Sequence, residues 1–279
     1  MATAPTPTGE QAGAAIGATT GAPARKVAVI TGGGTGVGAA TAVLLARQGY
    51  DLLINYSRSA DEAEASAQAC RDAGADAQVQ RGDVSQDADC RALAQAAIDR
   101  WGRIDALVNN AGVSVFGAAA AWDALDADTF QRVLAVNTLG SFQMVRACVE
   151  ALKASRGCIV NVSSVAGALG VGSSMPYIAS KGAINAMTLH LARALAPAVR
   201  VNAVCPGLIT SRWFVQGVGQ QGYEATLKGY EAGVPLQRAC SPEDVAEAIV
   251  WLVNGARTVT GELLLLDSGM HLGGIQAPR

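Results

Sequence analysis

The stretch VAVITGGGTGVG, residues 27–38, decides the fold. Its opening VAVIT is a short, β-branched apolar run, which is typical of a strand buried on both faces of a parallel sheet. The glycines that follow allow the backbone to turn tightly and to approach a pyrophosphate at the N-terminus of the next helix. The spacing Gly32-x3-Gly36-x-Gly38 differs from the commoner GxGxxG, and a glycine-rich turn without a ligand would also account for it. Its position between a buried strand and a helix favours a dinucleotide-binding site.

The pattern of strand, turn and helix repeats along the chain. After the first strand at 27–31, further strands are predicted at 51–56, 77–84, 104–110, 158–164, 199–205 and 262–267. Helices are predicted from the glycine turn to Gln48, over 60–72, from a cap at Ser85 to Trp101, from near Asp126 to Ala154, from about Pro176 to Ala196, and over 241–253. Strands that alternate with long helices indicate parallel βαβ crossovers. We therefore expect an α/β fold with a single Rossmann-type domain, in which a doubly wound, seven-stranded parallel sheet carries helices on both faces.

The chain is expected to hold one domain preceded by a tail. Residues 1–24 are rich in Ala, Thr, Gly and Pro, and they lack the basic start and the apolar run of a secretory signal. They are predicted to form a flexible tail. No segment resembling a linker interrupts residues 25–279, which we expect to form one NAD(P)-binding catalytic domain.

The composition argues against several classes of function. A formal net charge of −2 gives no electrostatic case for binding nucleic acid or an anionic membrane surface. No apolar run approaches the roughly 18 residues of a membrane span. The six cysteines are scattered without a CxxC motif, so we expect buried small hydrophobes in a protein of the reducing cytoplasm. Because the chain has two histidines, neither a metal site built on histidine nor a Ser-His-Asp hydrolase is expected.

Tyr177 and Lys181 carry the candidate proton chemistry. Both lie in YIASK at the start of a predicted helix, where the i, i+4 spacing places phenol and ammonium on one face. A free tyrosine has a pKa of about 10 and is a poor acid or base at neutral pH, but a nearby cation lowers that pKa. Such a phenol can give a proton to a carbonyl oxygen as hydride arrives, or take it back in the reverse reaction.

The YIASK segment is one of several short motifs in the chain. They are TGGGTGVG at 31–38, GDV at 82–84, NNAG at 109–112, VN at 136–137, NVSS at 161–164, YIASK at 177–181 and PG at 206–207. From about Arg25 to Leu272 the chain therefore resembles the short-chain dehydrogenase/reductase family, in its TGxxxGxG and YxxxK branch, and is similar to reductases of 3-oxoacyl groups on acyl carrier protein. The motifs follow one another in the order and at the spacings usual in that family.

The resemblance implies a catalytic tetrad of Asn137, Ser164, Tyr177 and Lys181. Tyr177 would be the acid or base, and Lys181 would lower its pKa and hold the hydroxyls of the nicotinamide ribose. Ser164 would hydrogen-bond the substrate oxygen; the adjacent Ser163 is the alternative, although the thirteen-residue gap to Tyr177 favours Ser164. Asn137 would anchor a water that links Lys181 to solvent, or it could simply tie a helix to a strand.

The resemblance also implies a set of cofactor contacts. Asp83 and Val84 would contact the adenine, and the segment 110–112 would lie beside the adenosine ribose. Thr210 would hold the nicotinamide carboxamide. Asparagines of an NNAG turn often serve packing as much as ligand binding in this fold. The implied contacts are Gly32, Thr35, Gly36, Val37, Gly38, Asp83, Val84, Asn110, Ala111, Gly112, Tyr177, Lys181, Pro206, Gly207, Ile209 and Thr210.

The end of the second predicted strand indicates which dinucleotide binds. An acidic residue there would hydrogen-bond the ribose 2′-hydroxyl of NAD, whereas this chain has Ser57 and Arg58. A hydroxyl and a guanidinium suit a 2′-phosphate, so NADP(H) is the expected cofactor and NAD(H) is the alternative. A solvated Arg58, or the nearby Asp61 and Glu62, would weaken that preference.

Residues 208–240 form a long connection that we expect to act as a lid over the substrate. Its Arg212 is the one nearby cation that we would nominate for a substrate carboxylate, although such a guanidinium is as often solvated. The expected substrate contacts are Ser114, Phe116, Leu169, Met175, Trp213 and Phe214. This mostly apolar wall predicts a hydrophobic ketone or secondary alcohol, or a 3-oxoacyl thioester.

The sequence thus predicts an oxidoreductase that uses NADPH to reduce a small carbonyl compound. An NAD-dependent secondary-alcohol dehydrogenase is the alternative within the same class, and a dinucleotide-sensing protein without turnover is the alternative from another class. The resemblance further implies a homo-oligomer, a dimer or tetramer, paired through the two long helices predicted at 126–154 and 176–196.

Overall fold

The computed structural model describes residues 1, 25–116, 123 and 125–273. The predicted tail at 1–24 lies outside the described residues, apart from Met1. The sheet has seven strands in the order β3-β2-β1-β4-β5-β6-β7, and every neighbouring pair runs parallel. The strands are β1 Lys26–Ile30, β2 Tyr50–Tyr56, β3 Ala77–Arg81, β4 Ala106–Asn109, β5 Cys158–Val162, β6 Arg200–Pro206 and β7 Leu263–Leu266. The predicted fold class is confirmed.

Strand order reverses between β1 and β4, in the middle of the sheet. Val29 of β1 pairs with Leu53 of β2 on one side and with Leu107 of β4 on the other. The connections that leave the carboxyl ends of β1 and β4 therefore diverge to opposite sides, and such a point in an open parallel sheet leaves a crevice that binds ligands. The glycine-rich turn follows β1 and so begins at this crevice.

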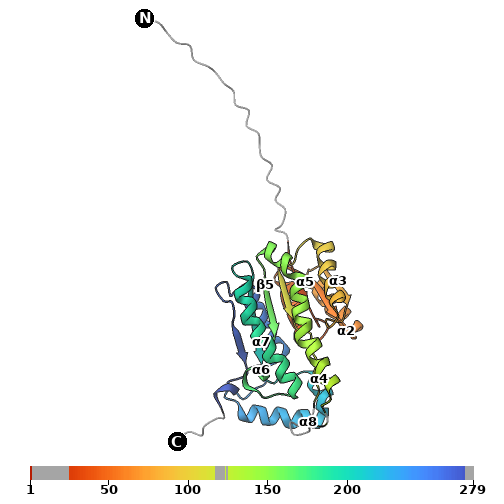
Figure 1. Cartoon of the computed structure of the whole chain (residues 1–279), viewed down its shortest axis with the longest axis vertical. Helices are drawn as coiled ribbons and strands as arrows, with labels where there is room; N and C mark the ends of the chain where they lie inside the picture. The colour runs from red at the N-terminus through yellow and green to blue at the C-terminus, as the bar shows by residue number, and fades with distance from the viewer. Residues whose placement is uncertain (2–24, 117–122, 124, 274–279) are drawn as a thin grey trace.

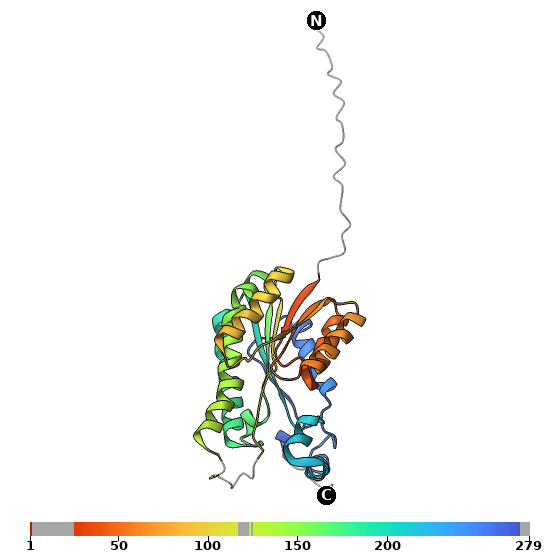
Figure 2. The same ribbon diagram turned by 90° about the vertical axis from the view of Figure 1, so that its right-hand side faces the viewer.

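Helices cover both faces of the sheet, and Figure 2 shows the sheet between the two helical layers. One layer contains α1 (Gly36–Arg47), α2 (Ala60–Asp72) and α9 (Pro242–Asn254), and the other contains α3 (Asp87–Trp101), α5 (Gly140–Ser155) and α7 (Met175–Leu195). Each layer is held by its own apolar core because side chains of a strand alternate between the faces. Ala28 and Ile30 of β1 join the first core, and Val27 and Val29 join the second.

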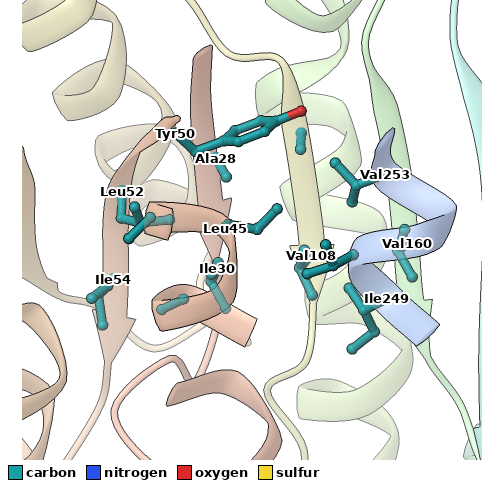
Figure 3. Packing of buried hydrophobic residues seen from close by; sticks show 14 of the residues in the cluster. Ala28, Ile30, Leu45, Tyr50, Leu52, Ile54, Val108, Val160, Ile249 and Val253 are labelled. Atoms are coloured by element: carbon teal, nitrogen blue, oxygen red, sulfur yellow. The ribbon is translucent and has the colours of Figure 1, made fainter. Parts of the chain in front are cut away.

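The first core packs α1 and α9 against the middle of the sheet. Leu45 of α1 and Ile249 of α9 are fully buried there beside Ile30 of β1 and Val108 of β4 (Figure 3). Burying one such side chain contributes about 1.5–3 kcal/mol relative to leaving it exposed. This packing fixes α1 on the sheet and so fixes the turn from which α1 starts.

The helix predicted from Asp126 to Ala154 is present and contains a π turn. It is divided into α4 (Ala127–Leu134), a π-helical turn η2 (Ala135–Leu139) and α5. The long helix predicted there is confirmed, because the residues that join the three parts keep helical φ and ψ angles. The π turn inserts a single residue, which hydrophobic periodicity over a long window does not register. Single π turns inside α-helices are frequent at functional sites, and this one contains Asn137.

Two helix starts were predicted from capping residues, and they behave differently. At α9 the Ser241 hydroxyl accepts a hydrogen bond from the Asp244 N–H, and the Asp244 carboxylate accepts one from the Ser241 N–H. The predicted cap at Ser241 is confirmed, and the two bonds together form a capping box. The helix predicted to be capped by Ser85 starts at Asp87 without a side-chain cap. The Ser85 N–H instead donates to the Asp83 carboxylate at 2.9 Å, which forms a local turn.

Most of the predicted lid at 208–240 is helical. Helix α8 spans Arg212–Gly233 and breaks at Gly219, whose φ of 74° and ψ of 166° are not helical. Figure 1 shows α8 lying across the end of the molecule opposite the start of β1, where the parallel strands end. Its repeated glycines hide the helix in the sequence, since each glycine disfavours a helix by about 1 kcal/mol relative to alanine.

The remaining general expectations concern membranes, metals and cysteines. Within the described ranges, no helix combines the length and the apolar character that a membrane span requires. Over the same residues, no cluster of three or more His, Cys, Asp or Glu side chains is placed to hold a metal ion. All six cysteines are free and buried, which confirms the prediction that they behave as small hydrophobes.

Candidate active site

The glycine-rich turn packs its backbone closely against the end of β1 and the NNAG turn, while Gly36 is exposed, with no atom within 4 Å of where its Cβ would lie. Gly32 has a φ of +61°, which L side chains rarely adopt, and a Cβ on Gly38 would lie 2.5 Å from the Gly32 carbonyl oxygen. Thr35 precedes α1 in an extended conformation and makes no capping bond with its side chain. The predicted segment from Gly32 to Gly38 therefore lies at the N-terminus of α1, where the helix favours an anion.

Two side chains that were not predicted to support this turn hold it from β2 and α2. Asn55 accepts a hydrogen bond from the Gly32 N–H at 3.2 Å and donates to the Gly82 carbonyl at 2.9 Å. The Ser66 hydroxyl donates to the Gly33 carbonyl at 3.0 Å. The only sequence signal for these ties is a polar residue at the end of a buried strand and a serine on the inner face of a helix.

The NNAG turn after β4 closes the other side of the crevice. The Asn110 amide donates to the carbonyls of Thr31 and Gly32, both at 2.9 Å, and the Thr31 hydroxyl accepts the N–H groups of Asn110 and Ala111 at 3.0 Å. The Asn110 side chain thus joins β1 to β4. A Cβ on Gly112 would lie 3.8 Å from the Lys181 ammonium, so this turn also reaches the predicted proton-transfer pair.

Asp83 and Val84 lie in the loop after β3, and their surroundings differ. Asp83 is exposed. The Val84 side chain is buried against Gly140 of α5, where a Cβ would lie 2.7 Å from a Val84 methyl carbon. The Val84 carbonyl accepts a hydrogen bond from Gln143 at 2.7 Å. The predicted adenine contacts at both residues are not tested by this arrangement and stay a prediction.

Asn137 projects from the π-helical turn η2 into the structure. Its amide accepts a hydrogen bond from the Val113 N–H at 2.8 Å and donates to the Val113 carbonyl and the Ser180 hydroxyl, both at 3.0 Å. The residue is buried. These contacts tie η2 to the loop after β4 and to α7, as the structural alternative for Asn137 expects. Its role as a water anchor stays a prediction.

Ser163 and Ser164 follow β5 and have different partners. The Ser163 hydroxyl donates to the Asn185 side chain at 2.6 Å and to the Lys181 carbonyl at 3.2 Å, so it is used to hold α7. The Ser164 hydroxyl accepts the Ala166 N–H at 3.1 Å and donates to the Pro206 carbonyl at 3.4 Å, and its nearness to Tyr177 acts to lower the pKa of that phenol. Of the two serines, Ser164 is the one placed with Tyr177.

Tyr177 and Lys181 lie one turn apart on α7. The Lys181 ammonium is 5.5 Å from the centre of the Tyr177 ring and donates to the Val162 carbonyl at 2.7 Å. Burial lowers the pKa of Lys181 to about 8. Burial also raises the pKa of Tyr177, and the nearby Ser164 hydroxyl opposes this only in part. The direction for Tyr177 is opposite to the one expected from the lysine charge alone.

Close contact between α6 (Ala166–Leu169) and α7 depends on a glycine. A Cβ on Gly167 would lie 2.4 Å from the carbonyl carbon of Lys181. The backbone of Lys181 therefore contacts Gly167 of α6 and accepts a hydrogen bond from the Ser163 hydroxyl. Neither Gly167 nor Asn185 stood out in the sequence, because their role depends on how two helices approach each other.

The segment after β6 is joined to the far end of α8. Thr210 donates from its backbone N–H to the Cys240 carbonyl at 2.8 Å, and Ile209 and Cys240 form an isolated β-bridge. The Tyr230 hydroxyl donates to the Asp267 carbonyl at 2.8 Å, and a Cβ on Gly207 would lie 2.3 Å from that hydroxyl. Tyr230 is thus a support of the Pro206-Gly207 segment, as expected if an aromatic residue of the lid packs against the body of the protein.

The predicted cofactor-specificity residues and the lid arginine have different surroundings. Ser57 and Arg58 are exposed after β2, and within the described part of the chain Arg58 makes no ion pair. Arg212, nominated for a substrate carboxylate, forms an ion pair with Glu62 at 2.9 Å. The role nominated for Arg212 toward a substrate carboxylate stays a prediction.

An aromatic cluster of Phe116, Trp213, Phe214 and Tyr223 covers the Tyr177 side of the crevice. The Phe116 ring centre lies 5.2 Å from that of Trp213 and 5.3 Å from that of Phe214, and Phe214 lies 6.1 Å from Tyr223. Trp213 is 6.0 Å from the ring of Tyr177. The structure thus brings three of the predicted substrate residues together beside the predicted proton donor.

The other predicted substrate residues lie on the segments that flank Tyr177. Leu169, at the end of α6, and Met175, at the start of α7, are exposed. The Ser114 hydroxyl meets that of Ser173 at 2.5 Å, which joins the loop after β4 to the loop before α7. Ser173 was not predicted.

Comparisons with known proteins agree with this arrangement. A family model described as Enoyl-(Acyl carrier protein) reductase matches residues 32–271. A protein of Streptomyces violaceoruber named for a ketoacyl reductase of granaticin polyketide synthase is 40% identical over 259 residues, which cover 91% of this chain and 99% of that protein. A crystal structure titled as a short-chain dehydrogenase/reductase of Burkholderia xenovorans superposes with a TM-score of 0.83 at 39% identity, covering 90% of this chain and 100% of that one. The chain belongs to the short-chain dehydrogenase/reductase family.

Other members of the short-chain dehydrogenase/reductase family that resemble the chain carry different names. One is 2-(S)-hydroxypropyl-CoM dehydrogenase 3 of Xanthobacter autotrophicus, 38% identical over 88% of this chain and 96% of that protein. Another is L-fucose dehydrogenase of Bos taurus, 34% identical over 90% of this chain and 91% of that protein. The chain is accordingly an oxidoreductase that uses a nicotinamide dinucleotide. Gly36 is exposed at the N-terminus of α1 with open space where a side chain would lie, which fits the pyrophosphate of such a cofactor.

Proposed function

We propose that this short-chain dehydrogenase/reductase reduces a ketone to a secondary alcohol with NADP(H), and that Tyr177 donates the proton. The observation that carries the proposal is the Lys181 ammonium 5.5 Å from the centre of the Tyr177 ring, one turn away on α7, with Ser164 near enough to the phenol to oppose the rise of its pKa. When bound, the dinucleotide supplies the hydride. The residues of the chain orient the carbonyl and deliver the proton to its oxygen.

The charge states of the pair favour reduction. A phenol whose pKa is raised by burial is neutral at pH 7 and holds the proton that a carbonyl oxygen needs. Ser164 donates a hydrogen bond to the same oxygen in the proposal, which polarises the carbonyl. Lys181 is mostly protonated at pH 7, because its pKa is about 8, and its charge stabilises the phenolate that remains after transfer. Asn137 ties the loop after β4 to α7 through Val113 and Ser180. In the proposal, Tyr177 regains its proton between that loop and that helix.

The cofactor preference is part of the proposal. Ser57 and Arg58 are both exposed at the end of β2, at the position that meets the adenosine ribose in this fold. Glu62, which would repel a 2′-phosphate, has its negative charge partly offset by Arg212. Arg58 is therefore the charged group assigned to the phosphate, and NADP(H) is the expected cofactor.

The substrate side of the proposal covers hydrophobic ketones and 3-oxoacyl thioesters. The aromatic cluster and the exposed Leu169 and Met175 offer apolar contacts close to Tyr177. The alternative is an NAD-dependent secondary-alcohol dehydrogenase, which the names of two relatives support. That direction needs Tyr177 as the base that takes the proton from the alcohol.

A homo-oligomer is proposed as well. Leu139 of η2, Phe142 of α5 and Leu189 of α7 are large apolar side chains that are exposed on the long helices expected to pair. Pairing would remove them from water. Light scattering should then give a mass at least twice the 28.3 kDa of the chain; a monomer at micromolar concentration contradicts the proposal.

A screen of ketones and alcohols with both cofactors, followed by nicotinamide absorbance, tests the function. The wild-type protein is expected to reduce ketones with NADPH. Tyr177→Phe should lose turnover by at least about 100-fold, the low end for losing a general acid, and keep NADPH binding close to that of the wild type. Reduction at the native rate by Tyr177→Phe overturns the proposal.

A further inference from the structure

The aromatic cluster forms the wall nearest to the proposed proton donor. Its rings come from two distant segments, Phe116 after β4 and Trp213 and Phe214 at the start of α8. The rings of Phe116 and its partners meet edge to face, with interplanar angles of 68° and 85°. Trp213 continues the series to Tyr177 at 6.0 Å with an angle of 46°. Edge-to-face pairs are the arrangement that aromatic rings prefer.

The cluster is seated by a glycine and ends at a break in α8. A Cβ on Gly217 would lie 2.1 Å from the Phe116 ring, so the absence of a side chain there lets the ring lie on α8. Gly219 ends the first part of the helix two residues later. Trp213 remains 40% exposed although it lies between Phe116 and Tyr177. An exposed ring beside the reacting group can pack against a substrate.

The charge that flanks the cluster is already paired. Arg212 directly precedes Trp213, and its guanidinium lies 2.9 Å from the Glu62 carboxylate. The same contact lowers the pKa of Glu62 and keeps it ionised. A substrate carboxylate at the cluster would have to take Arg212 from Glu62 and would lose its own hydration beside apolar rings.

Resting on the proposed ketone reduction, we propose that the substrate is an uncharged ketone with an aromatic ring on its carbonyl carbon, and that Phe116 and Trp213 select it. The carbonyl oxygen must reach the Tyr177 hydroxyl, so a ring attached to the carbonyl carbon falls beside Trp213. Phe116 holds Trp213 in position through their edge-to-face contact. The Arg212–Glu62 pair makes the cluster selective against carboxylate-bearing ketones.

Acetophenone and cyclohexyl methyl ketone form a matched pair that tests the aromatic part. They have the same carbon framework and differ in aromaticity, but their intrinsic reactivities also differ. The ratio of their kcat/KM values is therefore compared between wild type and Trp213→Leu, because the intrinsic difference cancels. Trp213→Leu should lower the acetophenone to cyclohexyl ketone ratio about fivefold, within the range of one aromatic pair.

Matched controls separate selection from damage to the fold. Trp251→Leu removes a 49% exposed tryptophan on α9 and should leave the ratio unchanged. Phe116→Leu should lower the ratio in the same direction as Trp213→Leu, which keeps the test valid if one variant melts early. A ratio that is unchanged or raised in both cluster variants overturns the inference.

A second pair of ketones tests the charge. The wild type should prefer acetophenone to 4-acetylbenzoate by about tenfold in kcat/KM. Glu62→Gln removes the charged partner of Arg212, so the guanidinium becomes free to meet the substrate carboxylate. This variant should therefore reduce the preference about threefold. A wild type that prefers the carboxylate, or a Glu62→Gln enzyme with the wild-type preference, contradicts the selection by charge.

The outcomes also separate this inference from the proposed function. If the wild type reduces aliphatic ketones with NADPH but leaves acetophenone untouched, the substrate class is wrong and ketone reduction stands. If it reduces no carbonyl compound with either cofactor, the proposed function fails first, and the substrate class fails with it.

Discussion

The Lys181 ammonium lies 5.5 Å from the centre of the Tyr177 ring, while its hydrogen bond goes to the Val162 carbonyl at 2.7 Å. The lysine therefore acts on the phenol through its charge rather than through a direct bond. Because burial lowers the pKa of Lys181 to about 8, this charge is present at neutral pH and is lost as the solution becomes alkaline.

The first prediction concerns pH. Reduction needs the proton on Tyr177 and the charge on Lys181, and the raised pKa of Tyr177 keeps the phenol neutral beyond the point where the lysine is discharged. The kcat/KM for ketone reduction should therefore fall on the alkaline side with a midpoint near 8. Lys181→Arg keeps its charge at high pH, so its residual rate should continue beyond that midpoint. If the alkaline fall of kcat/KM keeps its midpoint near 8 in Lys181→Arg, a group other than Lys181 causes it.

The second prediction separates two adjacent serines. Ser164→Ala should lower kcat/KM by about 100-fold or more, as for the loss of one hydrogen-bond donor to a developing oxyanion. Ser163→Ala removes the partner of the buried Asn185 side chain and should instead cost about 1–3 kcal/mol of unfolding free energy. Steady-state rates and thermal melting of both variants check this. A larger loss of rate in Ser163→Ala would reverse the assignment.

The third prediction concerns the cofactor. Arg58→Ala should weaken NADPH binding by about 1.5–3 kcal/mol, the range of a charge-assisted hydrogen bond, and leave NADH binding nearly unchanged. Titration of intrinsic fluorescence with both cofactors measures the two Kd values. Arg257→Ala, at an exposed arginine after α9, is the matched control. Tighter binding of NADH than NADPH by the wild type would contradict the role of Ser57 and Arg58.

The fourth prediction uses the contact between Gly207 and Tyr230. A Cβ on Gly207 would meet the Tyr230 hydroxyl at 2.3 Å, so Gly207→Ala should lower both the melting temperature and the affinity for the dinucleotide. Tyr230→Phe removes that hydroxyl and should restore part of both in the double variant, although it gives up the bond to the Asp267 carbonyl. Additive losses in the double variant would show that the two residues do not meet.

The seven strands and the position of the glycine-rich turn could be predicted because local patterns determine them. The run from Val27 to Thr31 is apolar enough to identify a buried strand, and the Tyr177–Lys181 spacing places both residues on one helix face. The π turn at Asn137 could not be predicted, since it is held by hydrogen bonds to Val113 and Ser180 from other parts of the chain.

The lid differs from its prediction for two physical reasons. Its glycines disfavour a helix locally, so α8 depends on contacts such as that of Gly217 with Phe116. The pair of Arg212 and Glu62 joins residues 150 positions apart, which no spacing rule in the sequence anticipates. Burial likewise raises the pKa of Tyr177, against the direction expected from the sequence. The charge of Lys181 could be read from the sequence, whereas the burial of the phenol could not.

The break at Gly219 gives α8 a modular character. The part before it, Arg212 to Val218, holds Trp213 and Phe214, while Tyr230 in the part after it donates a hydrogen bond to the Asp267 carbonyl. The segment from Arg212 to Val218 can therefore be replaced by another sequence, with Tyr230 and the proton-transfer residues left in place. Laboratory evolution confined to these seven positions should broaden the range of ketones that the enzyme accepts, while Ser164, Tyr177 and Lys181 stay unchanged.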